Sequence, residues 1–406
     1  MKSVSSLVAC NVYVSAGRPH HSEILLSILE QCQERCRNLR IGALSPTSQL
    51  YFANHACNAK SSSHPSDTGG SNKNGKKRGH IAMIHAYADG PYDRSSFHLA
   101  GDAVYVADVA SHVASLAIDG LTTFNTESNN KFKKLSENSQ HPLIGLVDHI
   151  SVMPLLPKED LKNPSLSAAA EAAKEHEKYN SYIPNDSHGL AATYIGKELS
   201  KRGVQVFYYG TSHPDQTPLA TIRREKTAFF HSGGLSNDSI SSTSSSLCQN
   251  QSKEKLMGSC TVGSPSSFVE NYNILLSGNV SKNQAMSLTK KIRERDGGIP
   301  GVEALTLPYN MGRYEVACNL LRPVEGSTDD ISNALNNWVN DHEEKERKKK
   351  GYSFYVEDSY RVGTTVEQCI DTLKKYSDDT EDIFTKDYDF FIFKRFRKFL
   401  LGRLNI

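Results

Sequence analysis

The stretch that most constrains the fold is Gln140–Leu155, QHPLIGLVDHISVMPL. Its dense run of Val, Ile and Leu favours a buried strand over a helix. Pro142 fixes its own φ and holds His141 in extended backbone at the entrance of this strand. An imidazole titrates near neutral pH, so it can accept a proton and return it. His141 is therefore a candidate acid–base residue, and the alternative is a histidine that only caps the end of a loop.

Length and charge set broad limits on the class of protein. With 406 residues, the chain can form two domains or one domain with large insertions. The net charge of +2 gives no global indication of a nucleic-acid partner, and none is expected. The hydrophobic content of 38% is low, which indicates polar insertions that dilute an ordinary core.

The eight cysteines form no CxxC motif and no Cys/His group with zinc-ligand spacing, so no metal site is expected. Several lie in apolar runs, where a reduced cysteine behaves as a small buried hydrophobe. The N-terminal MKSVSSLVACNVYVSAGR lacks the long apolar region of a signal peptide, and no run of 18 apolar residues exists. These features favour a reducing, cytoplasmic location without a membrane span.

Strands and helices alternate in the first part of the chain. The first expected elements are a strand over Leu7–Ser15, a helix from Ser22 to about Leu39 and strands over Ile81–Ala88 and Arg94–Ala100. A helix over Asp102–Asp119, the central strand, helices over Ser165–Tyr179 and Gly189–Arg202 and a strand over Val204–Tyr209 follow in that order. This pattern contains the β-α-β-β-α-β order of a ferredoxin-like sheet. Residues 54–80 and 122–139 are polar and are expected to be disordered insertions.

The same order restarts in the second part. A Gly/Ser turn and a strand occupy Gly258–Leu276, and a helix over Ser281–Asp296, a hairpin and two further helices follow. The sequence therefore predicts an α+β protein with two ferredoxin-like βαββαβ subdomains and long polar insertions. The expected boundaries are 1–232 for the first subdomain, 233–257 for a low-complexity linker and 258–380 for the second subdomain.

Residues 381–406 form a basic tail. Phe393, Phe396, Leu400 and Leu404 share one face of a predicted helix, and Lys and Arg side chains surround that face. Such a helix can lie on an anionic membrane surface. The preferred alternative is a terminal helix that packs its apolar stripe on the body of the protein.

Several short motifs occur together in one known family. They are Cys10–Arg18 (CNVYVSAGR), Asp89–Arg94 with Phe97–Gly101, Gln140–Leu155, Val204–Gly210 with Leu219–Arg223, and Gly258–Leu276 followed by VEALTLPY and YEVACNLL. In this order they resemble the formiminotransferase domain, or glutamate formimidoyltransferase, and more closely its single-domain plant relatives. The match covers most of residues 7–321 and continues more weakly through Gly351–Tyr376.

The resemblance implies a homodimer of two-subdomain chains that bind a reduced folate in a tunnel between the subdomains. It implies transfer of a formimino or formyl group between glutamate and N5 of tetrahydrofolate, which is a substrate, in histidine and one-carbon metabolism. The histidine of the His-Pro motif is the general acid–base in this family, and it corresponds to His141. No counterpart of the linked cyclodeaminase domain is recognised in the sequence.

Other site residues follow from the charge and shape of such ligands. Glutamate and folate carry carboxylates, which guanidinium groups bind well, so Arg94 and Arg223 are candidate ligand-binding residues. Each arginine has a surface ion pair as its alternative role. Asp148 is a candidate for orienting a histidine or binding the pterin amino groups, or else a strand carboxylate bonded to nearby backbone. Gly258 and Gly263 are candidates for close backbone approach to folate, or else parts of an ordinary turn.

Two positions depart from the family pattern. Leu143 occupies a position that is usually arginine, and Ala16 occupies a position that is usually acidic. Loss of an arginine removes a charge-assisted contact of about 1.5–3 kcal/mol. The alternative function is therefore a catalytically weak folate-binding protein of the same fold.

Overall fold

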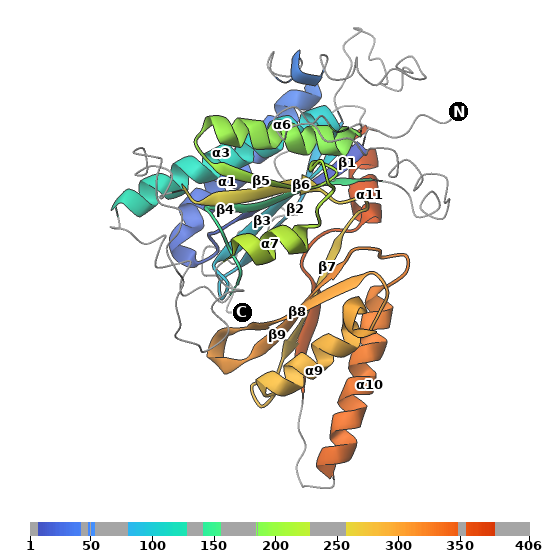
Figure 1. The fold of residues 1–406 in the computed structure, drawn as a ribbon. Coiled ribbons are helices and arrows are strands. Elements are labelled where there is room, and N and C mark those ends of the chain that lie inside the picture. Colours follow the sequence, from blue (N-terminus) through green and yellow to red (C-terminus); the bar gives the residue numbers. More distant parts are fainter. Residues whose placement is uncertain are drawn as a thin grey trace, which may run out of the picture. The chain divides into compact units, whose positions relative to one another are not determined.

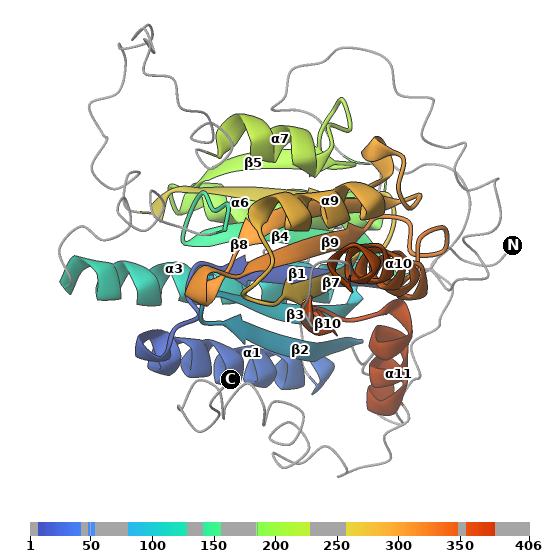
Figure 2. The same ribbon diagram turned by 90° about the horizontal axis from the view of Figure 1, so that it is seen from below.

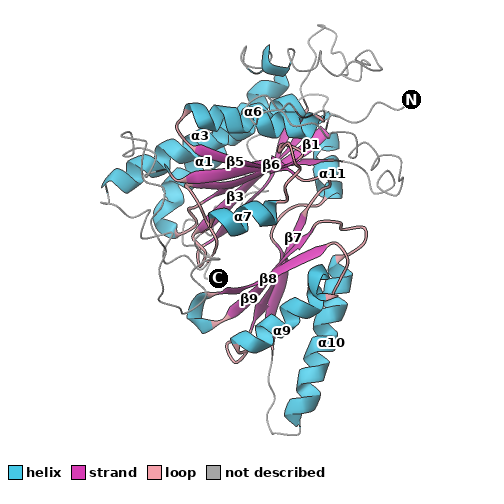
Figure 3. Cartoon of the chain, viewed as in Figure 1, coloured by secondary structure: helices cyan, strands magenta, loops and turns pink. Residues whose placement is uncertain are grey.

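The computed structural model describes residues 7–41, 48, 50–52, 80–127, 141–155, 184, 186–227, 257–347 and 355–377. Its contacts divide these residues into two units, each built from helices and strands (Figures 1 and 3). The first unit takes the described residues up to Val152 and those from 184 to 265, and the second takes 153–155 and 266–377. The α+β class predicted from the sequence is confirmed.

The first unit contains one mixed sheet. Its elements are β1 (Leu7–Val14), η1 (Pro19–His21), α1 (Ser22–Ile41), β2 (Ile81–Asp89), β3 (Arg94–Asp102), α3 (Ala103–Glu127), β4 (Val147–Pro154), α6 (Ser187–Lys201), β5 (Gln205–Gly210), α7 (Leu219–Lys226) and β6 (Ser259–Ser264). The strand order is β2-β3-β1-β4-β6-β5. The pairs β2–β3 and β1–β3 are antiparallel, and β4–β6 and β5–β6 are parallel. Figure 2 shows β5, β4, β1, β3 and β2 in this lateral order.

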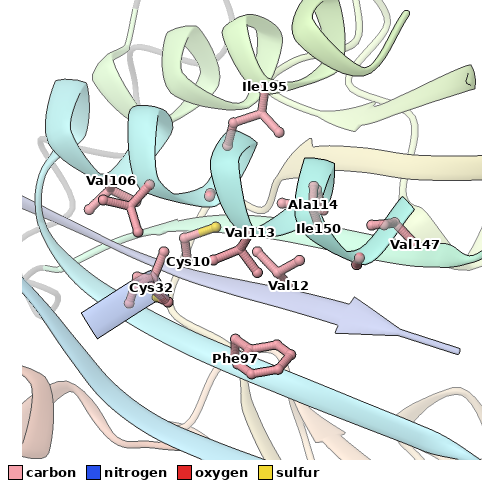
Figure 4. Close-up of a cluster of buried hydrophobic side chains, with 14 of the residues drawn as sticks. Cys10, Val12, Cys32, Phe97, Val106, Val113, Ala114, Val147, Ile150 and Ile195 are labelled. Atoms are coloured by element: carbon pink, nitrogen blue, oxygen red, sulfur yellow. The ribbon is translucent and has the colours of Figure 1, made fainter. Parts of the chain in front are cut away.

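Alternation along β1 decides which face of the sheet is apolar. Val8, Cys10, Val12 and Val14 are fully buried and belong to one core cluster with residues of α1, α3 and α6. Figure 4 shows Cys10 and Val12 of β1 beneath Val106, Val113 and Ile195 of the helices. In Figure 1, α3 and α6 lie on one side of this sheet and α7 lies on the other. The helix-covered face therefore holds the core, and the opposite face carries the other half of each strand.

The helix α3 has the length and apolar composition of a membrane span over Ala103–Phe124. Its residues Val106, Val109, Ala110 and Val113 are fully buried in the core of the first unit, which is the usual place of such a helix in a globular domain. α3 also continues to Glu127, beyond the expected start of a polar insertion at 122. Burial of Leu121 extends the apolar stripe past the predicted end at Asp119.

The second unit has a smaller sheet. Its elements are β7 (Glu270–Leu276), α9 (Lys282–Ile292), η5 (Glu294–Asp296), β8 (Val302–Pro308), η6 (Asn310–Gly312), β9 (Tyr314–Leu320), α10 (Thr328–Arg347), β10 (Val356–Arg361) and α11 (Val366–Ser377). The strand order is β10-β7-β9-β8, and the three pairs are antiparallel. Ser281 and Gln284 form a capping box at the start of α9, and fully buried Trp338 of α10 lies in the core.

The segment from 258 is divided between the two sheets. β6 lies between β4 and β5 in the first sheet, whereas β7 starts the second sheet. The sequence predicts the whole stretch from Gly258 as part of the second subdomain, because a parallel partner far away in the chain leaves no local pattern. Ferredoxin-like identity of the two sheets stays a prediction, as do the domain boundaries. The predictions for 54–79, 128–139, the helix over 165–179, the linker 233–256 and the tail 381–406 lie outside the described residues.

Candidate active site

Arg94 begins β3, directly after the turn formed by residues 90–93. The turn is held against Gly17, where a Cβ atom would lie 2.4 Å from the carbonyl oxygen of Asp89 and 2.5 Å from the amide of Arg94. Only glycine allows this approach, so the SAGR motif fixes the position of Arg94. Two motifs that are distant in the sequence therefore meet at the start of β3.

Asp148 joins both predicted arginines. Its carboxylate accepts from Arg223 Nη1 at 2.8 Å and Arg223 Nη2 at 3.2 Å, and Arg94 Nη2 lies 3.1 Å from Oδ2. It also accepts from the backbone N–H of Ile144 at 2.9 Å. The residue is fully buried. Burial raises the pKa of this carboxyl, but Arg223 and Arg94 outweigh that effect and hold the pKa below its usual range.

His141 lies against the same arginine. Arg94 Nη1 is 2.6 Å from Nε2 and 2.9 Å from Nδ1 of the imidazole, and Nδ1 is 2.9 Å from the carbonyl oxygen of Pro142. A carbonyl oxygen only accepts, which assigns the ring proton to Nδ1 and leaves the lone pair on Nε2 facing the guanidinium. Burial and the Arg94 cation lower the pKa of His141 well below its usual value, so the imidazole is neutral at pH 7.

Arg223 completes this group from α7. Besides Asp148, its guanidinium donates to the carbonyl oxygen of Pro142. The segment from His141 to Ile144 is thus held by Arg223 at Pro142 and by Asp148 at Ile144. His141, Arg94, Asp148 and Arg223, predicted from three separate motifs, form one connected cluster.

Tyr13 of β1 supports the cluster from the sheet. The Arg94 guanidinium carbon lies 4.4 Å from the centre of the Tyr13 ring, which is a cation–π contact. The Tyr13 ring also stacks on the His149 ring, with 5.5 Å between the ring centres. It makes an edge contact with the His98 ring, with 6.3 Å between the ring centres. Arg94 is therefore held by a carboxylate, an imidazole and an aromatic face at once.

These rings belong to a row of aromatic and polar side chains across the first sheet. His85, His98, Tyr13, His149, Thr261 and Tyr209 come one from each strand, in the order β2, β3, β1, β4, β6 and β5. Neighbouring ring pairs lie 5.4–6.3 Å apart from His85 to His149 and from His149 to Tyr209. Tyr13 alternates with Val12 and Val14, so the row lies on the face opposite the helix-packed core.

Hydrogen bonds fix the orientation of His149 in this row. Thr261 donates its hydroxyl proton to the carbonyl oxygen of Asp148 at 3.3 Å, and its oxygen lies 3.0 Å from His149 Nδ1. The Thr261 oxygen must then accept, which places the proton of His149 on Nδ1. Burial, with Arg223 as a further cause, lowers the pKa of His149 to about 3, so this ring is also neutral at pH 7.

The two predicted glycines have different positions. Gly258 has φ +69° and pairs with Gly145 in an isolated bridge, next to the segment that carries His141. At Gly263 of β6, a Cβ atom would lie 2.4 Å from both Cδ1 and the carbonyl oxygen of Tyr209. Gly263 thus allows the Tyr209 backbone and ring to pack against β6. Both positions have a clear structural role in joining β6 to the sheet.

The two departures from the family pattern lie in apolar surroundings. Ala16 is fully buried and belongs to the core cluster, and Leu143 is 8% exposed. Tyr13, His98 and Thr261, which the structure adds to the site, are not among the residues predicted from the sequence. The alternation of polar with apolar residues in β1, β3 and β6 was the available signal.

Comparison with known proteins gives one informative relative. The chain is 26% identical over 264 residues to the formiminotransferase cyclodeaminase-like protein of Arabidopsis thaliana, a match that spans 63% of this chain and 76% of that protein. Structural comparison with the periplasmic protease PqqL of Escherichia coli gives 10% identity, 100% coverage of this chain, 41% coverage of that chain and a TM-score of 0.16, which is too low to inform the fold. No protein-family model matches the chain. The Arabidopsis match confirms the resemblance drawn from the sequence motifs, and this chain is a relative of the formiminotransferase-like proteins.

Proposed function

We propose that this protein is a folate-dependent transferase that moves a formimino or formyl group between glutamate and N5 of tetrahydrofolate. The observation that carries the proposal is the cluster of His141, Arg94, Asp148 and Arg223 in a relative of formiminotransferase-like proteins. It combines a neutral imidazole, which can act as a base, with two guanidinium groups, which can bind carboxylates.

The proposed role of His141 is proton transfer. Attack of a secondary amine on a formimino carbon requires removal of a proton from the attacking nitrogen and delivery of a proton to the departing amine. A neutral imidazole can do both in turn, which typically accelerates a reaction by about 10²–10⁴-fold. Nε2 faces Arg94 in the structure, so the guanidinium must move away from the lone pair before His141 accepts a proton.

A ligand carboxylate provides a reason for that movement. Arg94 Nε is buried and lacks a hydrogen-bond partner among the described residues, so this guanidinium retains an unsatisfied donor. A carboxylate oxygen would satisfy the donor and compete with His141 for the same cation. Asp148 would keep Arg223 and Arg94 near each other during the exchange.

The row of rings on the first sheet fits a flat heteroaromatic ligand such as the pterin of a folate. Stacked aromatic faces favour planar rings. Asn11 Oδ1 and His98 Nδ1 are buried on the same face and have no hydrogen-bond partners within the part of the chain that the structure describes. Polar groups of a pterin could satisfy such atoms, so the residues present fit the substrate class. We include Asp148, Gly258 and Gly263 in the proposed binding region.

Purified full-length protein provides the direct test. It is expected to form 5-formimino-tetrahydrofolate from N-formiminoglutamate and tetrahydrofolate, with 5-formyltetrahydrofolate and glutamate as the second pair to assay. His141→Ala should reduce turnover by about 10²–10⁴-fold and leave calorimetric folate binding intact. His112→Ala, on a partly exposed histidine of α3, is the matched control and should retain activity. Equal turnover of His141→Ala and wild type would exclude the acid–base role.

A second candidate function is folate binding with little or no catalysis. The specific observations are the Arg94 guanidinium on the lone pair of His141 and the apolar residues Leu143 and Ala16. Folate binding without transfer from either donor would support this alternative and exclude the enzyme.

Several broader features belong to the same proposal. We propose a ferredoxin-like arrangement for both sheets, a homodimer, a cytoplasmic location and a place in histidine and one-carbon metabolism. The element order β7-α9-β8-β9-α10-β10 and the strand order β10-β7-β9-β8 support the first of these for the second unit. Sedimentation analysis of the purified protein would test the homodimer.

A further inference from the structure

A group of metal-binding side chains lies outside the cluster around His141. His20 and His21 come from η1, and Asp93 comes from the turn between β2 and β3. One donor atom of each residue lies within 4.8 Å of the other two. His21 and Asp93 are separated by 72 positions in the sequence, so no local motif reveals the group. This explains why the spacing of cysteines and histidines predicted no metal site.

The two imidazoles are oriented by the end of α3. Their ring centres lie 4.1 Å apart. The His20 ring stacks on Phe124 at 5.8 Å, and the His21 ring meets the edge of Phe124 at 5.0 Å. His21 is buried and His20 is exposed, so one histidine is fixed in the protein and the other faces solvent. A site of this form is accessible to an ion in solution.

Asp93 has a second oxygen that the fold does not use in a hydrogen bond. Oδ1 accepts from the backbone N–H groups of Gly17 at 2.8 Å and Arg18 at 3.0 Å, and it lies 3.2 Å from His21 Nδ1. Oδ2 is buried and has no hydrogen-bond partner within the described residues. Arg18 Nε lies 3.7 Å from Oδ2, on a side chain that is 52% exposed.

The balance of these contacts favours a cation between the three residues. Oδ1 of Asp93 accepts both backbone hydrogen bonds, so Oδ2 remains as a buried anionic oxygen. Arg18 can move into solvent and leave that oxygen to a stronger partner. A buried carboxylate oxygen without a bonded partner is costly unless a cation or a donor compensates it.

We propose that His20, His21 and Asp93 form a binding site for a divalent transition-metal ion of the Zn²⁺ class. Two imidazole nitrogens and one carboxylate oxygen suit Zn²⁺ and its neighbours better than Mg²⁺ or Ca²⁺, which prefer oxygen ligands. Ligands at 2.0–2.2 Å from a tetrahedral ion are about 3.4 Å apart. The donor atoms lie within 4.8 Å of one another, and rotation of the exposed His20 side chain can bring its nitrogen closer to the other two. Three protein ligands would leave a fourth position open to water.

The site would act on the turn that positions Arg94, because Asp93 is its neighbour in the chain. The hydrogen bonds from the Gly17 and Arg18 N–H groups to Asp93 already hold this turn against the segment before η1. An ion bound to Asp93 and the two histidines would add a third contact between η1 and the turn. The proposal does not depend on the transferase function, and a metal titration tests it without any assay of activity.

The experiment is a titration of the full-length protein with ZnCl₂, followed by calorimetry, and with CoCl₂, followed by the visible absorption of bound cobalt. The variants are His20→Ala and Asp93→Asn, with His112→Ala as a control for loss of one histidine. Asn at position 93 can still accept the two backbone hydrogen bonds through its Oδ1, and His20 is exposed, so both variants should fold. Circular dichroism would confirm their folding.

Wild type and His112→Ala are expected to bind one more Zn²⁺ equivalent than His20→Ala, or to bind it at least about 10-fold more tightly. Asp93→Asn should show the same loss, and both variants should lose the cobalt absorption. Other histidines and cysteines of the chain can bind zinc weakly, which makes the difference between variants the decisive quantity. Identical titrations for wild type, His20→Ala and Asp93→Asn would overturn the proposal.

Discussion

Nη1 of Arg94 lies 2.6 Å from Nε2 of His141, so the candidate base directs its lone pair at a permanent cation. The same guanidinium binds Asp148 and stacks on Tyr13. The basicity of His141 therefore depends on where Arg94 is held. Any ligand or substitution that draws Arg94 away changes the proton affinity of the imidazole.

Substitution of Arg94 by methionine tests this dependence. Arg94→Met should raise the pKa of His141, because a nearby cation that disfavours the imidazolium is removed while the Asp148 carboxylate, which favours it, remains. Titration of the imidazole signals by NMR measures the change. Arg224→Met, at an exposed arginine of α7, is the matched control. An unchanged His141 pKa in Arg94→Met would contradict the coupling.

Asp148→Asn should destabilise the protein by about 3–5 kcal/mol, because it leaves two arginines without their buried carboxylate. Urea unfolding would measure the loss. Asp215→Asn, at an exposed aspartate, should change stability by less than about 0.5 kcal/mol. Since the folded-state pKa of Asp148 is lowered, its contribution should be complete above about pH 4 and disappear as the pH falls below that value. A loss equal to that of Asp215→Asn would refute the prediction.

Asp89 should show the opposite pH dependence. Burial raises its pKa from 3.8 to about 6, although the Tyr92 N–H and the Tyr87 hydroxyl favour the ionised form. The folded state then binds more protons than the unfolded state between pH 4 and 6, so stability falls as the pH rises. This group alone would lower the free energy of unfolding by about 3 kcal/mol between pH 4 and 7. Asp89→Asn should remove that decline in urea unfolding experiments at several pH values, and parallel pH curves for both proteins would exclude it.

Gly263→Ala should destabilise the first unit by about 1–3 kcal/mol, because the new methyl group would overlap the Tyr209 backbone and ring. Gly278→Ala is a suitable control, since the nearest atom to its Cβ position is the flexible Arg313 Cγ at 3.9 Å. Thermal unfolding of both variants gives the comparison. Equal stability of the two variants would show that β5 and β6 adjust freely at this position.

Much of the site was predictable because its residues lie in short motifs with recognisable chemistry. The HP pair, the DGPYDR turn and LATIRR identified His141, Arg94 and Arg223, and the structure brings them together through Asp148. Proximity itself was not predictable, since Arg223 and Asp148 are 75 positions apart. Tyr13 was missed because an aromatic residue in a strand normally packs in the core. Its alternation with Val12 and Val14 was visible in the sequence. The row that it forms with His98 and His149 appears only when the strands are paired.

The same distinction between local patterns and long-range contacts explains which parts of the fold could be predicted. Helices and hairpins with their own periodicity, such as α6 and the β2–β3 pair, appear where the sequence predicts them. β6 could not be assigned to the first sheet, because its partners β4 and β5 are parallel strands and the sequence carries no turn that would join them.

The insertion of β6 between β4 and β5 also determines when this sheet can be completed during synthesis. Until residue 264 leaves the ribosome, the facing edges of β4 and β5 have no partner strand. A nascent chain that ends before Gly258 would expose two strand edges with unpaired backbone N–H and C=O groups and be prone to aggregate. Expression of residues 1–232 alone should therefore yield insoluble protein, whereas extension to Pro265 supplies the missing strand.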